Sequence, residues 1–397
     1  MKAKTLIFLA CLAAAVVVVA TLLARRDRPA VSPTAGGTGA ARLFPGLDSR
    51  INDVALIEVR NGDKSFTLKK GAAGWELPEK GGYPAKLEEV VRALRGLTDL
   101  REGEAKTSKP ELYSKIGVQD PDGKPAEPAG GGPTLLTLKD ATDQVVAAVI
   151  VGNSRPGTPA GVYIRKAGEA QSWLAEGQLE IPADPVRWID AQFVNIPRER
   201  LKGVTITQPD GETLRVSRAK PEDASFTVHD VPAGKELRFP TAGDELGSAI
   251  SFLSLEDVAP VATIDFEGKS GGKPGAYGEF RTFDGLMIAT QLTEKDGKTW
   301  IKIAAYSEAS EPPKAPEGQP EAPKPPGKSP EEVKKEADEL NARLSRWAFQ
   351  IPQYKAASLQ KRMADVLKSD APPTPPPAME GTTPLFPPQP APVPKGG

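Results

Sequence analysis

The chain has 397 residues, enough for two or three domains whose apolar cores need no disulfide support. Its 51 lysines and arginines nearly balance its 52 aspartates and glutamates, so it lacks the excess positive charge that draws proteins onto nucleic acid. The one cysteine, Cys11, lies in the N-terminal apolar segment, which leaves no internal disulfide or thiolate metal site elsewhere. No nucleic-acid partner is therefore expected.

The N-terminus predicts a membrane anchor. Lys2 and Lys4 precede an apolar run over residues 5–24, and three arginines follow within four residues. Twenty helical residues span roughly 30 Å, the thickness of a hydrocarbon core, whereas the apolar region of a cleaved signal has about 7–15 residues. Leu22 also places a bulky side chain where signal cleavage needs a small one. A cleaved signal and a lipoprotein modified at Cys11 are the alternatives that this pattern disfavours.

The sequence gives a weaker indication of the orientation of the anchor across the membrane. Positive charges flank the anchor on both sides, so the positive-inside bias is nearly balanced. An N-terminal anchor followed by one long polar chain most often leaves that chain outside the cytoplasm, which is the orientation we expect. Residues 25–48 contain small residues, glycines and prolines and are expected to form a flexible linker.

The stretch GDKSFTLKKGAAGWELP, residues 62–78, has three glycines and three lysines and raises the possibility of a phosphate-binding loop. Such a loop leads directly into a helix N-terminus, whereas these glycines lead into further alternating or β-branched residues. Asn61-Gly62-Asp63 is a typical hairpin turn. We therefore predict a hairpin here, and a similar one over residues 201–230 with Asp210-Gly211 at its corner.

Each predicted hairpin is followed by an amphipathic segment. Residues 87–97 place apolar side chains at helical spacing, and residues 246–253 repeat that spacing after a plausible cap at Thr241 or Asp244. Both segments are predicted to be helices that lie on a sheet. The apolar stripes are Leu87, Val90, Val91, Leu94 and Leu97 in the first, and Leu246, Ala249, Ile250 and Leu253 in the second.

Strand-like runs with turn residues between them follow in both halves of the chain. Each half then ends on a tryptophan, Trp188 or Trp347, followed by an Ile-Pro pair. This succession predicts two tandem units, residues 49–197 and residues 198–370. The predicted strands cover residues 133–140, 144–153 and 160–177 in the first half, and 261–269, 277–292 and 298–308 in the second.

The second unit carries a proline-rich insertion at residues 308–330 and a helix over residues 330–347. Ser329 can cap that helix, Pro330 suits its first position, and Glu332 completes a capping box. Its narrow apolar seam either packs on its own unit or seats on a partner helix. The seam residues are Val333, Ala337, Leu340, Leu344 and Trp347.

Proline also dominates the C-terminal residues 371–397, which are expected to be a disordered tail because so few of their side chains could form a core.

The sequence contains no recognisable catalytic motif. His229 is the only histidine, no Gly-x-Ser-x-Gly elbow supplies a serine nucleophile, and a surface position on a strand is expected for this histidine. Nucleotide-binding fingerprints and EF-hand loops are also missing, and the glycine-rich residues 271–278 are expected to be a turn. We therefore predict no catalytic, cofactor-binding or metal-binding residues. A catalytic pair of carboxylates is not excluded, because the two acids that hydrolyse a glycoside need not be close in sequence.

The ordered motifs resemble a known family. They are GWEL at residues 74–77, the helix that ends in LTDL, LYSKIGVQDP at residues 112–121, and VIVGNSRPGTPAGVYIRKAG at residues 149–168. Together they resemble domain-of-unknown-function family 4340 over roughly residues 50–255, and WAFQIPQYKAASL at residues 347–359 does so less specifically. The family occurs in bacterial proteins described as auxiliary components of gliding-motility-related ABC transport systems. The resemblance implies an accessory role with membrane transporter subunits as protein partners, and supplies no catalytic residues.

We therefore expect an α+β protein made of two tandem β-rich units of antiparallel hairpins, each covered by an amphipathic helix, after one transmembrane helix. The expected function is non-enzymatic: an anchored binding protein of the bacterial cytoplasmic membrane, auxiliary to an ABC-type transport system, whose soluble part faces the periplasm or the cell exterior. The alternatives are a structural linker between membrane and cell wall, and an envelope glycan hydrolase that uses paired carboxylates. The sequence indicates no small-molecule ligand or cofactor.

Overall fold

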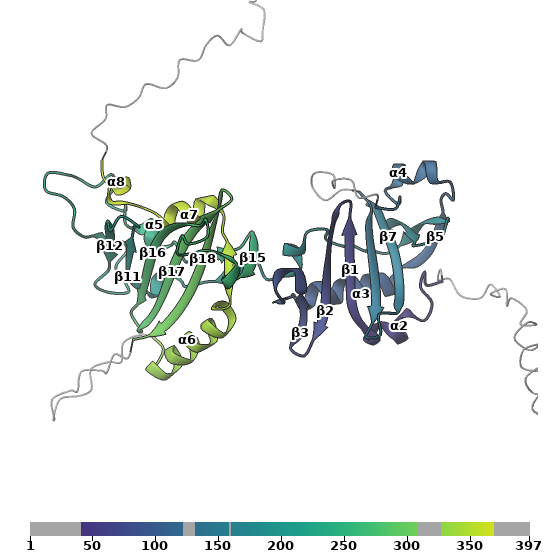
Figure 1. The fold of residues 1–397 in the computed structure, drawn as a ribbon, viewed down its shortest axis with the longest axis horizontal. Helices are drawn as coiled ribbons and strands as arrows, with labels where there is room; N and C mark the ends of the chain where they lie inside the picture. The colour runs from purple at the N-terminus through teal and green to yellow at the C-terminus, as the bar shows by residue number, and fades with distance from the viewer. Residues whose placement is uncertain (1–40, 122–131, 159, 309–326, 369–397) are drawn as a thin grey trace, which may run out of the picture.

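The computed structural model describes residues 41–121, 132–158, 160–308 and 327–368. The predicted anchor at residues 5–24 and tail at residues 371–397 lie outside these ranges, as do most of the linker and of the insertion. Within them, no helix is both long enough and apolar enough to cross a membrane. The described chain is a mixed α+β structure with two large antiparallel sheets and few helices (Figure 1).

The first sheet has nine strands in the order β4-β3-β2-β1-β6-β7-β8-β9-β5. The stretch at residues 62–78 supplies β2 and β3, and Gly62 turns between strands with a φ of 58°, so the predicted hairpin is confirmed. The strands are β1 (Val54–Asn61), β2 (Lys64–Gly71), β3 (Gly74–Leu77), β4 (Tyr83–Pro84), β5 (Arg101–Ala105), β6 (Thr134–Asp140), β7 (Val145–Arg155), β8 (Gly161–Lys166) and β9 (Ser172–Glu176).

The second sheet has eight strands in the order β13-β12-β11-β16-β17-β18-β19-β15. The glycine-rich residues 271–278, expected to be a turn, lie mostly in β16; a side chain at Gly278 would come within 2.6 Å of Thr290 Oγ1 on the neighbouring strand, which accounts for that glycine. The strands are β11 (Leu201–Thr207), β12 (Thr213–Ser217), β13 (Thr227–Val228), β15 (Asp257–Pro260), β16 (Lys273–Thr282), β17 (Leu286–Lys295), β18 (Lys298–Ser307) and β19 (Trp347–Gln350). Strands β10 (Gln192–Val194) and β14 (Leu253–Ser254) pair separately.

From β3 onward the two large sheets have the same strand order. The correspondence is easy to follow, since β3 matches β13, β2 matches β12, and so on to β5 and β15. This correspondence corrects one predicted equivalence. Trp347 lies in β19, whose counterpart β9 contains Trp173, so Trp188 is not its equivalent. Trp188 instead ends a short 3-10 helix and is fully buried.

The predicted helix after the first hairpin is confirmed as α3 (Leu87–Asp99). Its buried stripe consists of Val90, Ala93 and Leu97, with Leu94 packed beside them. Leu87, predicted to be part of the stripe, is 61% exposed. It occupies the first helical position, and helical side chains lean toward the N-terminus, so its side chain points past the start of the helix.

The helix predicted over residues 246–253 is wrong. Only one helical turn forms, α5 (Asp244–Gly247), and turns lead from it to β14. Leu246, Ile250 and Leu253 are nonetheless buried. Further on, Phe252 adopts a φ of 53°, which a helix does not allow, and the Ile250 carbonyl accepts a hydrogen bond from the Ile196 amide at 3.4 Å. The helical spacing therefore predicted correctly which side chains are buried, whereas a contact with a residue far away in the sequence decided the backbone conformation.

The strand predicted over residues 261–269 is also wrong. Val261–Thr263 form a 3-10 turn, and a loop follows in which the Asp265 carboxylate accepts hydrogen bonds from the backbone amides of Ser270, Glu267 and Gly272. Led by the Ser270 amide, these bonds lower the pKa of Asp265 to about 2. The side chain thus takes the Glu267 amide, which the predicted strand would have used in a ladder, and holds the loop that follows.

The insertion helix is α6 (Pro330–Leu344), and both bonds of its predicted capping box are present at Ser329. It ends three residues earlier than predicted. Its seam packs on its own unit rather than on a partner helix, with Val333, Ala337 and Leu344 buried (Figure 1). Asn341 pairs with the β18 edge as another strand would: its Oδ1 accepts from the Ala305 amide at 2.8 Å, and its Nδ2 donates to the Ala305 carbonyl at 2.7 Å.

Short helical segments complete the described chain. Among them, α4 lies over the first sheet, while α7 and α8 follow β19. These segments are α2 (Leu47–Arg50), η1 (Ile51–Asp53), η2 (Pro78–Lys80), η3 (Pro110–Leu112), α4 (Tyr113–Ile116), η5 (Pro185–Trp188), η6 (Arg198–Arg200), η7 (Val261–Thr263), α7 (Gln353–Leu359) and α8 (Met363–Val366).

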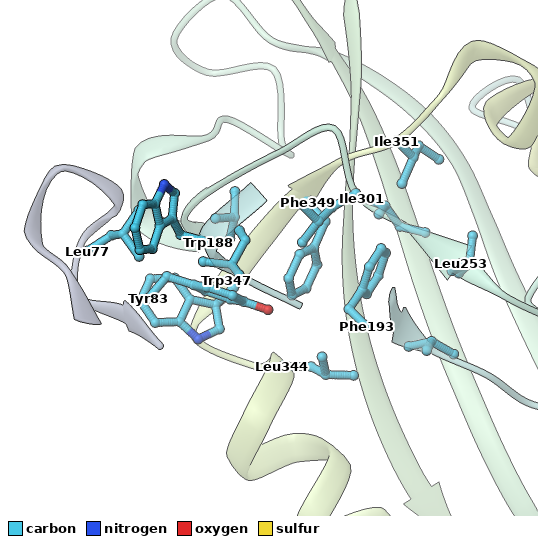
Figure 2. Close-up of a cluster of buried hydrophobic side chains, with 14 of the residues drawn as sticks. Leu77, Tyr83, Trp188, Phe193, Leu253, Ile301, Leu344, Trp347, Phe349 and Ile351 are labelled. Carbon is cyan, nitrogen blue, oxygen red and sulfur yellow. The ribbon is translucent and has the colours of Figure 1, made fainter. Parts of the chain in front are cut away.

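The two sheets meet at a shared core rather than at a loose linker. The Tyr83 ring packs edge-on against Trp347 at 5.0 Å, and Phe349 stacks on Phe193 at 4.1 Å (Figure 2). Burial raises the pKa of Tyr83 to about 12. At the rim, Lys80 Nζ lies 2.5 Å from Asp257 Oδ1. Buried side chains therefore run without a break from one sheet to the other.

Gly81 permits the closest approach between the sheets. A Cβ atom there would lie 2.3 Å from Pro260 Cγ, and Gly81 also has a φ of +70°. We expect Gly81→Ala to lower the free energy of unfolding by about 2–4 kcal/mol, from left-handed strain and overpacking together. Gly82→Ala is the matched control, because its φ is +81° but its nearest contact would be an ordinary 3.6 Å, so it should cost about 1 kcal/mol. Urea unfolding measures both, and equal losses would contradict the close approach.

Candidate functional site

The outer face of each large sheet, opposite the core, is partly covered by a loop. In the first sheet, Tyr113 and Val118 pack over Ile150, with Leu135 and Tyr163 at the margin. These covering residues belong to the LYSKIGVQDP motif. The uncovered strands carry polar side chains, such as Glu58 on β1 and Lys139 on β6, which form an ion pair of 2.7 Å. That face offers little apolar surface to a partner.

On the second sheet, Phe266 of the loop after β15 covers one end of the outer face, where it packs with Trp300 and accepts a hydrogen bond from Gln291. The rest of this face is open over five strands, from β12 to β18. Strand register places its side chains in cross-strand rows, and they alternate with the buried residues Val204, Ile206, Phe280 and Ile288. We call this surface the open face. It consists of Gly203, Thr205, Thr207, Thr213, Arg215, Ser217, Tyr277, Glu279, Arg281, Met287, Ala289, Gln291, Lys302, Ala304 and Tyr306.

Two tyrosines give the open face its apolar character. Tyr277 on β16 is 38% exposed and Tyr306 on β18 is 50% exposed. Met287 lies beside Tyr306, and small alanines separate the two aromatic rows. Partial burial, with the nearby Glu279 carboxylate, raises the pKa of Tyr277, so its phenol is a neutral hydrogen-bond donor at physiological pH. Tyrosine and methionine are enriched in the centres of protein interfaces.

Charged residues at one end of the open face are paired with one another. Arg281 donates hydrogen bonds to Glu279 and Glu308. These contacts raise the pKa of Arg281, and the hydrogen bond to Glu279 has the largest effect. Arg215 holds Asp230 with two donors, at 3.0 and 2.6 Å. These pairs border a hollow of about 470 Å³, which β12 and the turns after β13 and β16 enclose. The hollow is polar and open, which suits a peptide or a loop rather than a buried small molecule.

His229, the one histidine, lines this hollow. It shares a hydrogen bond of 2.6 Å with Ser217 Oγ, a pairing that the sequence did not predict. The adjacent Asp230 carboxylate bonds Arg215 rather than the imidazole. A serine nucleophile needs a base that a third group orients and donors for the oxyanion, and the described contacts at His229 provide neither. The pair is an exposed cross-strand contact, consistent with the surface position expected for this histidine.

A second hollow, of about 530 Å³, lies between β10 and α6 and is lined by Glu336, which forms a pair of neighbouring acids with Asp284. Arg200 binds Asp284 and Glu336, each at 2.9 Å, and Lys328 lies 3.0 Å from Glu336. Burial alone would raise the pKa of both carboxyls, but hydrogen bonds from Thr282 to Asp284 and from Arg200 to Glu336 lower it below the usual range. Both acids are therefore ionised, whereas a glycosidase needs one that is protonated.

Among the described residues, no group of three or more histidine, cysteine or acidic side chains lies close enough together to hold a metal ion. No catalytic or ligand residue was predicted from the sequence, and the open face was not predicted either. Alternation in AYGEFRTF predicted a strand there, with tyrosine, glutamate and arginine on one side. Only the loop that covers part of a sheet decides which outer face stays open, and no local pattern reports that.

Comparison with known proteins bears out the family resemblance. No curated protein matches the chain. A family model described as a domain of unknown function, DUF4340, matches residues 75–269, somewhat later in the chain than the expected residues 50–255. The match begins at Trp75 in β3 and ends in the Asp265 loop, so it includes strands of both large sheets. Residues 75–269 of this chain are therefore a DUF4340 domain.

Proposed function

We propose that the chain is a membrane-anchored, extracytoplasmic binding protein without enzymatic activity, an auxiliary component beside an ABC-type transport system. The observation that carries the binding role is the open face, where two exposed tyrosines and a methionine lie on a rigid sheet. Aromatic side chains on a preformed surface bind partners at low entropic cost. The family resemblance supports the transporter as partner, and the apolar residues 5–24 support the anchor.

The repeated strand order supports two tandem units that arose from one. In this proposal both units keep the scaffold, while the open face of the second has diverged into a contact surface. Glu58 and Lys139 mark the polar surface on the corresponding strands of the first unit. The shared core at Tyr83 and Trp347 would hold the open face at a fixed orientation to the anchor-proximal unit. A rigid mount of this kind reduces the entropy lost when a partner docks.

Among the residues that the structure describes, none supports the glycan hydrolase alternative. The carboxyl groups with a resolved shift in the described chain all have a lowered pKa, which supplies bases but no general acid. The wall-linker alternative rests on the composition of residues 371–397 alone. Neither observation outweighs the open face, so binding remains the proposed role.

The test is gentle detergent extraction of tagged full-length protein, followed by identification of co-purifying proteins. Wild type should recover an ABC ATPase or permease, and Tyr277→Ala combined with Tyr306→Ala should reduce that recovery at least tenfold. Tyr354→Ala is the matched control, because Tyr354 is 66% exposed on α7, away from the open face. Recovery of no transporter subunit would contradict the transporter role, and equal recovery by all three chains would contradict the open face as the contact.

A further inference from the structure

The place where the described chain ends points to an occupant for the open face. The last described residues run beside the loop that follows β13: the Lys368 amide donates to the Glu236 carbonyl at 2.9 Å, and Leu367 bridges Leu237. The same loop begins at His229 and Asp230, which line the hollow at the edge of the open face. The six steps along the chain from Asp230 to Glu236 span at most about 22 Å, so residues 369–397 leave the fold close to this surface.

Residues 369–397 have the composition that an aromatic face binds. They include eleven prolines and only three charged side chains, with Leu385-Phe386 as an apolar pair in their second half. Proline-rich segments bind surfaces on which tyrosine rings pack against the pyrrolidine rings, because such segments lose little conformational entropy on binding. Few charges also mean little desolvation cost. At about 3.1 Å per residue, ten residues of this composition reach roughly 31 Å, enough to cross the face from its edge.

We propose that residues 369–397 bind the open face of the same chain and cover Tyr277 and Tyr306 until a partner displaces them. The inference rests on the open face being a binding surface, as in the proposed function, but not on which partner it binds. Tethering raises the local concentration of the tail to about 1 mM, so a peptide affinity near 100 μM would keep the face about 90% covered. At this level of coverage, a partner that binds the open face more tightly can still displace the tail.

Tyrosine nitration of the full-length protein in detergent tests the proposal, with peptide mapping to give a rate for each residue. The wild-type chain is compared with one in which Leu385→Ser, Phe386→Ser and Pro387→Ser weaken the tail. Nitration of Tyr277 and Tyr306 should become about tenfold faster in the altered chain, the value that 90% coverage implies. Tyr354 is the internal control and should not change. Unchanged rates at Tyr277 and Tyr306, or an equal rise at Tyr354, would overturn the proposal.

Two further measurements locate the contact and its source. A fluorescent peptide of residues 369–397 should bind the tail-altered chain and its Tyr354→Ala variant, and should bind at least tenfold more weakly when Tyr277 and Tyr306 are alanine. Equal binding by all chains would place the tail elsewhere and overturn the proposal. Protection in wild type should also be independent of protein concentration, whereas protection lost on dilution would show that a second copy supplies the tail. Neither measurement needs the transporter, so the two proposals can fail separately.

Discussion

Phe349→Ala is expected to lower the free energy of unfolding by about 3–5 kcal/mol, because the substitution opens a cavity where the two sheets meet. Phe349 is fully buried, stacks on Phe193 and meets Tyr83 edge-on at 6.3 Å. Neighbours on two separate elements, β4 and β10, cannot both move into the vacated space, so the loss should lie at the upper end for a core residue.

Tryptophan fluorescence during urea unfolding of the full-length chain measures this loss, since Trp188 and Trp347 belong to the same cluster (Figure 2). Tyr354→Ala serves as the control, because it truncates an exposed aromatic side chain and should change the free energy of unfolding by less than about 0.5 kcal/mol. A loss below 1 kcal/mol for Phe349→Ala would mean that the sheets do not share a core in solution.

Arg218→Met is expected to cost about 3–5 kcal/mol, because Arg218 is a buried cation held almost entirely by backbone carbonyls. The side chain is 5% exposed and lies over the Phe226 ring at 4.6 Å. Burial, reinforced by the nearby Arg198, lowers the pKa of Arg218. Removing the guanidinium leaves several buried acceptors without donors. Those acceptors are the carbonyls of Arg198, Glu199, Leu201, Pro221 and Asp223, at 2.7–3.2 Å.

Arg215→Met is the matched control, three residues earlier in β12. Arg215 forms an exposed pair with Asp230, and such pairs contribute about 0–1 kcal/mol. Arg218→Lys should recover only part of the loss, because a lysine ammonium has three donors and cannot reproduce the planar fork. Urea unfolding of the three variants gives the ranking, and similar losses at positions 215 and 218 would contradict the structural role of Arg218.

Local rules were sufficient where a residue's conformation depends on its near neighbours in the chain. Asp296-Gly297 turns between β17 and β18 as predicted, with both residues at positive φ, because few other pairs adopt that geometry without strain. The capping box at Ser329 formed for the same reason, since its hydrogen bonds link residues three apart. Alternation likewise predicted the strands around Tyr277 and Tyr306.

The same rules failed where a distant segment competes for the backbone. Residues 246–253 have helical spacing, yet the Ile196 amide, just after β10, donates to the Ile250 carbonyl, and Phe252 turns to positive φ. Gly247 also packs so closely on Phe226 that a Cβ atom would lie 2.3 Å from the ring, and glycine weakens a helix. Residues 261–269 form a loop for a related reason, because the Asp265 carboxylate accepts a hydrogen bond from the Glu267 amide that a strand ladder would use.

The sequence by itself determined that this chain is an α+β protein with repeated hairpins, a capped insertion helix and the motifs of its family. These features depend on period, turn chemistry and capping, all of which act over a few residues. Only the tertiary structure decided that the second sheet keeps an open face and that the two sheets share a core. Both outcomes depend on contacts between residues far apart in the chain, such as Tyr83 with Trp347, and no local pattern encodes which distant surface a side chain will meet.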